Sequence, residues 1–141
     1  MPRDRIKKGD KMMAKQNKYN NNRSAGYDSN AEKEYGDVLE LLRIADPPEI
    51  ISYQHHPPAV VLVGSVKWRI DFFVETEKHK FFIEVKGLAT SDYKIKLELY
   101  RSLYPQGNLL PLFIVKKYGP HRFMVIDEIG TEGINTPVIW S

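Results

Sequence analysis

The spacing of apolar residues changes along the chain and predicts two helices separated by strands. Over residues 29–45, apolar side chains recur every three or four positions, which is typical of a helix. Ser29 and Glu32 fit the S-x-x-E capping box at its start, and the prolines at positions 47 and 48 end it. A second helix is predicted from residues 91–92 to residue 104, before Pro105.

Between and after these helices, the apolar residues are mostly β-branched or aromatic, which predicts strands. A polar segment at residues 75–79 joins two of the runs into a hairpin, and Gly64-Ser65 and Gly119-Pro120 are expected turns. The fold class is therefore α/β (or α+β), with a mixed sheet that carries helices on its faces. The expected strands span residues 50–55, 59–63, 67–74, 80–85, 109–115 and 123–126.

Charge divides the chain into an arm and a domain. The net charge is +3, but residues 1–26 carry eight basic and two acidic residues, or +6, so the other 115 residues carry −3. This Asn-rich arm is too poor in aliphatic residues to fold alone, so we predict a disordered arm at residues 1–26 and a single domain at residues 27–141. The arm fits either a tail that follows a polyanion or a solubilising leader.

Composition excludes several classes of protein. The chain has no cysteine, which removes disulfides, thiolate metal sites and cysteine nucleophiles. No apolar run approaches the ~18 residues of a membrane span, and the basic start leads into polar sequence, so we expect a soluble, intracellular protein. The serines lack a plausible His-Asp pair and no phosphate-binding loop motif is present, which argues against serine hydrolases and ATPases.

Three charged residues interrupt the two apolar runs of the predicted hairpin. Asp71 lies in the first run, and Glu84 and Lys86 end the second on one face, two positions apart. Burying such groups costs several kcal/mol unless they pair with one another or bind a metal. One interpretation is a structural salt bridge from Lys86. The other is a hard-ligand site for Mg²⁺ or Mn²⁺ that hydrolyses phosphodiesters, with the lysine beside the attacking water.

The set of Asp71, Glu84-Val85-Lys86 and the upstream Glu32 resembles the PD-(D/E)XK nuclease superfamily, although Ile70 stands where the motif has proline. More narrowly, residues 18–126 resemble a phage-encoded branch described as Holliday-junction-resolvase-like endonucleases. The segments that carry this second resemblance are Lys18-Tyr19-Asn20, Tyr27-Asp28-Ser29-Asn30-Ala31-Glu32, the Ile-Asp-Phe strand, Glu-Val-Lys-Gly, and Asp92-Tyr93-Lys94-Ile95-Lys96.

The resemblance implies a restriction-endonuclease-like fold, with a mixed central sheet flanked by helices, and a metal-dependent DNA endonuclease. Asp71, Glu84 and Glu32 would bind Mg²⁺, with Mn²⁺ as a substitute, and Lys86 would be the catalytic lysine. The implied substrate is branched DNA, in phage recombination or replication in the host cytoplasm. Cutting two strands symmetrically implies a homodimer, for which the apolar stretch at residues 137–140 is a candidate surface.

Other polar residues have weaker claims on the site. Glu32 is also the third residue of the capping box, and Glu34 is the reserve candidate for the helix carboxylate. Lys96 falls amid the apolar arc of the second helix and is expected to contact phosphate. His55 and His56 are expected on opposite faces of a strand, so that they do not share a metal ion. The residues proposed to bind DNA are Lys96, Lys94, Arg23 and Lys18.

A non-catalytic interpretation remains open beside the nuclease. In it, the chain is a nucleic-acid-binding accessory protein, and the three charged residues form a structural ion-pair cluster.

Overall fold

The computed structural model describes residues 30–87 and 90–137. The chain divides into two compact units, residues 1–33 and 34–141. Of the first unit, only the first turn of helix α2 (Asn30–Ile44) is described; the sheets and helix α3 (Ser91–Leu103) belong to the second. The predicted basic arm at residues 1–26 lies outside the described residues. Neither described helix combines the length and apolar character that a membrane crossing needs.

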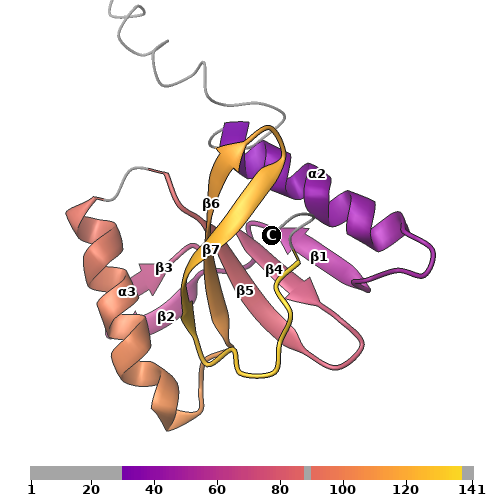
Figure 1. Cartoon of the computed structure of the whole chain (residues 1–141). Helices are drawn as coiled ribbons and strands as arrows, with labels where there is room; N and C mark the ends of the chain where they lie inside the picture. Colours follow the sequence, from indigo (N-terminus) through magenta and orange to yellow (C-terminus); the bar gives the residue numbers. More distant parts are fainter. Residues whose placement is uncertain (1–29, 88–89, 138–141) are drawn as a thin grey trace, which may run out of the picture. The chain divides into compact units, whose positions relative to one another are not determined.

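The second unit contains a mixed sheet of five strands in the order β1-β4-β5-β6-β7, together with a two-stranded sheet (Figure 1). In the larger sheet, β5 and β6 are parallel and the other neighbours are antiparallel. This arrangement confirms the predicted mixed sheet with helices. The strands are β1 (Ser52–His55), β2 (Val60–Val63), β3 (Val66–Trp68), β4 (Phe72–Glu75), β5 (Lys80–Val85), β6 (Leu112–Gly119) and β7 (Arg122–Ile129), and the 3-10 helix η1 (Tyr104–Gln106) follows α3.

One predicted strand is wrong in an instructive way. The run at residues 67–74 is divided between β3 and β4, with residues 69–71 outside both. The two halves have different partners, because Trp68 pairs with β2 whereas Phe72 pairs with β1 and β5. The chain changes sheets at residues 69–71, and Asp71 therefore lies just ahead of β4.

Helix α2 packs on one face of the larger sheet through a buried aromatic cluster. The ring of Tyr35 lies 5.0 Å from Phe123 in an edge-on contact and 5.6 Å from Phe72. Aromatic pairs of this geometry add to the free energy of burying the rings. The helical spacing of its apolar residues predicts that Leu41 is buried with Tyr35 and Val38, which is wrong for Leu41, because it is 52% exposed and Leu39 is buried instead.

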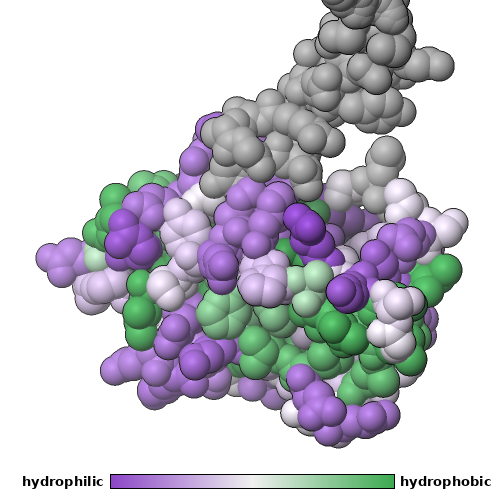
Figure 2. Space-filling model, turned by 180° about the vertical axis from the view of Figure 1, so that it is seen from behind, coloured by the Kyte–Doolittle hydropathy of each residue, from purple (hydrophilic) through white to green (hydrophobic). Residues whose placement is uncertain are grey.

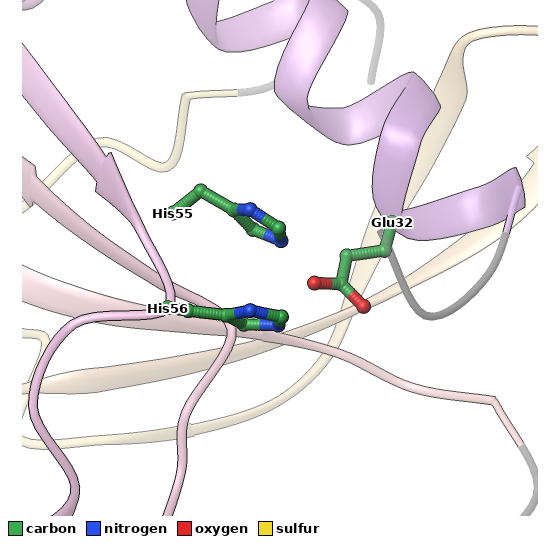
Figure 3. A group of neighbouring side chains, drawn as sticks. All are labelled: Glu32, His55 and His56. Atoms are coloured by element: carbon green, nitrogen blue, oxygen red, sulfur yellow. The ribbon is translucent and has the colours of Figure 1, made fainter. Parts of the chain in front are cut away.

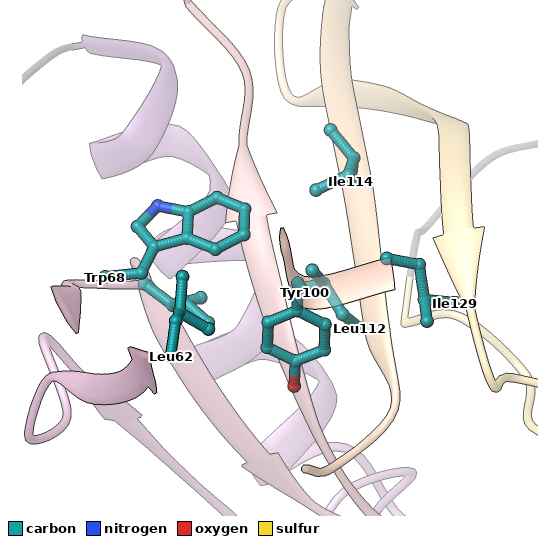
Figure 4. Packing of buried hydrophobic residues seen from close by; sticks show 7 residues of the cluster. Leu62, Trp68, Tyr100, Leu112, Ile114 and Ile129 are labelled. Atoms are coloured by element: carbon teal, nitrogen blue, oxygen red, sulfur yellow. The ribbon is translucent and has the colours of Figure 1, made fainter. Parts of the chain in front are cut away.

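Helix α3 packs on the opposite face, since neighbouring strand residues point to alternate sides of a sheet. Its Tyr100 is fully buried, makes an edge-on contact with Trp68 and donates a hydrogen bond to the Leu110 carbonyl. Trp68 thus packs in the core on this side of the sheet. The buried cluster on this side also holds Leu62, Ile70, Leu112, Ile114 and Ile129 (Figure 4).

The surface carries apolar as well as polar side chains. Figure 2 shows hydrophobic and hydrophilic areas side by side on one face of the molecule. Exposed apolar residues include Val61, Val63 and Val66 in the two-stranded sheet and Ile95 on α3. Scattered exposure of this kind is normal for a folded protein.

Candidate functional site

Asp71 and Glu84 lie together at one end of the hairpin formed by β4 and β5. The register pairs Phe72 with Ile83, so the next residues outward, Asp71 and Glu84, are neighbours. The backbone N–H of Asp71 donates to Glu84 Oε1 at 3.1 Å, and the backbone N–H of Val85 donates to Asp71 Oδ2 at 2.8 Å. Each carboxylate is therefore hydrogen-bonded to the main chain beside the other, as the predicted hairpin required.

Both carboxylates have limited access to water. Asp71 is 9% exposed and Glu84 is half-buried. Oxygen donors so arranged suit a hard divalent cation.

Lys86 follows two residues after Glu84, where β5 ends. Its backbone N–H donates to the Val115 carbonyl of β6 at 2.8 Å, which fixes the main chain on this side. Among residues 30–87 and 90–137, no ion pair within 4.0 Å joins Lys86 to Asp71 or Glu84. The salt bridge expected from Lys86 in the structural interpretation is therefore not formed there.

The side chains of Glu84 and Lys86 line a cavity of about 300 Å³ beside the start of α3. Thr90 caps this helix, because its Oγ1 accepts a hydrogen bond from the Tyr93 N–H at 3.1 Å. The cap fixes the first turns, whose side chains complete the wall. The lining residues are Trp68, Arg69, Glu84, Lys86, Gly87, Thr90, Asp92, Tyr93 and Lys96.

The two lysines predicted on α3 have different positions. Lys96 lines the cavity with a side chain that is 22% exposed, and its Nζ lies 3.1 Å from Asp92 Oδ2. Lys94 is exposed and lines a separate shallow surface with Ile95. The structure therefore brings Lys96, but not Lys94, to the cavity of Glu84 and Lys86.

Tyr93 lines the cavity but was not among the predicted site residues. Its ring makes an edge-on contact with Trp68 at 6.1 Å. Burial raises the pKa of the Tyr93 hydroxyl, and the negative charge of Glu84 raises it further, so the hydroxyl stays protonated and can donate. Its position three residues before Lys96 is the signal that could have found it, because residues i and i+3 share a helix face.

The two candidate carboxylates of α2 differ in their surroundings. Glu32 is 3% exposed in the first turn. Glu34 Oε2 lies 2.6 Å from Lys117 Nζ, and its Oε1 accepts from the His121 N–H at 2.8 Å. Burial alone would raise the pKa of Glu34, but these hydrogen bonds and charges lower it below its ordinary value. Glu34 thus attaches α2 to the turn between β6 and β7, and this contact explains it without a catalytic role.

The prediction that His55 and His56 point to opposite faces is wrong. His55 ends β1, whereas His56 follows the strand with a φ of +55°. The left-handed backbone breaks the alternation, and the two rings stack with centroids 3.8 Å apart and planes at 26° (Figure 3). His55 and His56 each offer a ring nitrogen as a ligand atom, and these two atoms lie within 4.8 Å of each other.

Some predicted residues fall partly or wholly outside the described chain. Lys18 and Arg23, proposed to bind DNA, lie in the undescribed residues 1–29. Of the candidate dimer surface at residues 137–140, only Pro137 is described. It is buried, and its carbonyl accepts a hydrogen bond from the Tyr35 hydroxyl at 2.8 Å.

Comparison with protein-family models and with curated proteins found no match to this chain.

Proposed function

We propose that this protein is a metal-dependent DNA endonuclease. The observation that carries the proposal is the mutual hydrogen bonding of the Asp71 and Glu84 segments at one strand end, with Lys86 lining the same cavity as Glu84. Phosphodiester hydrolysis needs a hard Lewis acid and a cationic group near the reacting phosphate. The carboxylates of Asp71 and Glu84 supply ligands for the Lewis acid, and Lys86 is the candidate for the cationic group.

The donor set fits Mg²⁺, with Mn²⁺ as a substitute. Asp71 and Glu84 offer carboxylate oxygens, which hard cations prefer to nitrogen or sulfur donors. When bound, such an ion polarises the phosphate and lowers the pKa of a bound water. The resemblance to PD-(D/E)XK nucleases adds Glu32 as a third carboxylate.

The remaining cavity residues have distinct roles in this proposal. The ammonium group of Lys86 orients the attacking water or neutralises charge that develops on the phosphate. Lys96 binds a phosphate of the DNA backbone, and its pairing with Asp92 holds the side chain at the cavity. The protonated Tyr93 hydroxyl donates to a phosphate oxygen. Lys94, Lys18 and Arg23 are proposed to contact the DNA backbone as well.

We propose branched DNA, such as junctions or flaps, as the substrate. This choice of substrate follows the resemblance to Holliday-junction-resolvase-like endonucleases. Contacts to phosphates carry no direct sequence information, so selectivity would come from the shape of the DNA. Cutting two strands of a junction would require a homodimer, and we place the activity in the host cytoplasm.

The test is a cleavage assay on labelled four-way junction, flap and linear duplex with Mg²⁺, Mn²⁺ or EDTA. We expect cleavage of branched substrates only with metal, and its loss in Asp71→Asn, Glu84→Gln and Lys86→Met. Glu77→Gln is the matched control, because Glu77 is an exposed carboxylate in the loop that joins β4 and β5. Glu32→Gln tests the third carboxylate. Circular dichroism and DNA-binding measurements establish that each variant folds and still binds.

A non-catalytic DNA-binding protein is the second candidate, and one observation favours it. Both carboxylates accept backbone hydrogen bonds, which gives them a structural role without any metal. Binding to branched DNA without cleavage under either metal would support this second function and overturn the first.

A further inference from the structure

We infer that His55 and His56 together form a binding site for a first-row transition-metal ion, with Zn²⁺ as the probe. The site is chemically separate from the carboxylates of Asp71 and Glu84. The inference does not depend on the proposed nuclease activity.

The first support is the shared direction of the two rings. Neighbouring residues in a regular strand point to opposite faces, so a His-His pair in a strand does not bind one ion. Here the φ of +55° at His56 turns its ring to the side of His55, and the rings stack at 3.8 Å (Figure 3). A ligand nitrogen of each lies within 4.8 Å of the other.

The second support is that the protein maintains this backbone conformation at a cost. A left-handed conformation is unfavourable for a residue with a Cβ atom, by roughly 1–2 kcal/mol, and such residues gather at functional positions. The backbone N–H of His56 donates to the Asp71 carbonyl at 2.8 Å. His55 pairs with Phe72 in the β1–β4 ladder, and its ring lies 5.1 Å from that of Phe72. The main chain on both sides therefore holds the pair in place.

The donor chemistry selects the metal. Imidazole nitrogen favours Zn²⁺, Co²⁺, Ni²⁺ or Cu²⁺ over Mg²⁺, whereas the carboxylates of Asp71 and Glu84 have the opposite preference. Two nitrogens bound at about 2.0–2.1 Å in a tetrahedral site lie roughly 3.3 Å apart, so the rings must rotate out of their stack until the in-plane lone pairs meet at the ion. Water completes the coordination, as in metal sites that keep an open position.

The experiment uses the full chain freed of metal with a chelator. Co²⁺ is titrated and followed by its visible absorption, and Zn²⁺ affinity is measured by calorimetry and by displacement of Co²⁺. We expect one tight site per chain and a higher unfolding temperature with Zn²⁺, since a ligand that binds only the folded state stabilises it. Mg²⁺ at equal concentration should not displace Co²⁺ from this site.

The variants are His55→Gln and His56→Asn. Asn tolerates the left-handed conformation, so His56→Asn removes the imidazole and keeps the backbone. Each change should weaken Zn²⁺ binding at least about tenfold, the lower end of the effect of altering a residue that merely supports a ligand. His79→Asn is the control, because His79 lies in the loop between β4 and β5.

Two results would overturn the inference. One is Zn²⁺ affinity unchanged in both folded variants, and the other is an equal loss in His79→Asn, which would indicate general surface binding. The double variant Asp71→Asn/Glu84→Gln separates this inference from the proposed function. It should keep the Zn²⁺ site while losing any Mg²⁺-dependent cleavage, so either proposal can fail alone.

Discussion

The acidic end of the β4–β5 hairpin and the histidine pair at the end of β1 are neighbours, but their side chains meet for different reasons. Asp71 and Glu84 meet because two strands keep regular register and alternation. His55 and His56 meet because one residue abandons alternation. A hydrogen bond from the His56 N–H to the Asp71 carbonyl links the two regions. The difference teaches that periodicity locates side chains only as far as the backbone stays regular.

The largest expected effect separates the two regions by their chemistry. Glu84→Gln and Asp71→Asn should each lower Mg²⁺-dependent cleavage by about 10³-fold, because the metal contributes several kcal/mol to the transition state. The amide oxygens can still accept the backbone hydrogen bonds, so the fold should persist. Single-turnover cleavage of a junction checks the rate. Zn²⁺ affinity should be unchanged, and a parallel loss of both would show that the regions form one site.

Lys86→Met is expected to lower the cleavage rate by about 10²-fold, the loss typical of removing one group that stabilises transition-state charge. Methionine preserves most of the side-chain volume that lines the cavity. DNA affinity without metal, measured by fluorescence anisotropy, should change little. A loss confined to affinity would assign Lys86 to binding instead.

Glu34→Gln tests the attachment of α2 to the turn between β6 and β7, a contact that belongs to neither of the two regions. At neutral pH, the free energy of unfolding of the variant should be about 1–2 kcal/mol lower than that of the wild type. The reason is that charge-assisted hydrogen bonds to Lys117 and His121 are weakened. The pKa of Glu34 is lowered in the folded state, so its contribution is present above the unfolded pKa and is lost as pH falls through the folded one.

Urea unfolding of the wild type and of Glu34→Gln at neutral and strongly acidic pH measures this effect. The two stabilities should converge in acid. Cleavage by the folded variant should match the wild type, and a large loss of cleavage would return Glu34 to the catalytic candidates.

Lys96→Ala and Lys94→Ala form a matched pair on one helix. Lys96→Ala should weaken DNA binding by about fivefold and reduce the slope of log affinity against log salt by about 1, as for the loss of one phosphate contact. Lys94→Ala should have the smaller effect, because its side chain lies away from the cavity of Glu84 and Lys86. Equal effects of the two substitutions would indicate that the cavity is not part of the DNA-binding surface.

The smallest expected effect concerns the backbone of the histidine pair. Glycine at position 56 relieves the left-handed strain but makes the unfolded chain more flexible, so His56→Gly should change stability by less than about 1 kcal/mol. His55→Gly, in the strand itself, should destabilise by about 1 kcal/mol. Thermal unfolding of both variants without metal measures the difference. A larger loss in His56→Gly would contradict the strain argument.

Much of the fold was predictable because its elements carry strong local signals. Helix α2 ends before the prolines at positions 47 and 48, and polar residues between two apolar runs specify the β4–β5 hairpin. Ser29 of the predicted capping box lies outside the described residues. The same hairpin made the meeting of Asp71 and Glu84 predictable. The position of Lys96 near this site was also predictable, because a lysine within the apolar arc of a helix is unusual.

The rest depended on information that periodicity does not contain. The break at residues 69–71 follows from a change of pairing partner, which no local pattern reveals. β6 and β7 extend beyond the predicted runs because their ends pair with each other through polar residues such as Lys116 and Lys117. The left-handed φ at His56 affects one residue only, and the N–H of that residue donates a hydrogen bond to the Asp71 carbonyl, which is distant in the sequence.

The hydrogen bond from the Val85 N–H to Asp71 Oδ2 has a consequence for spectroscopy. One amide proton reports on one carboxylate, since its resonance and its exchange with deuterium depend on what that oxygen is doing. A cation that draws electron density from Asp71 would alter the Val85 signal directly. This single amide thus offers a view of the acidic end of the hairpin in solution, even with DNA absent.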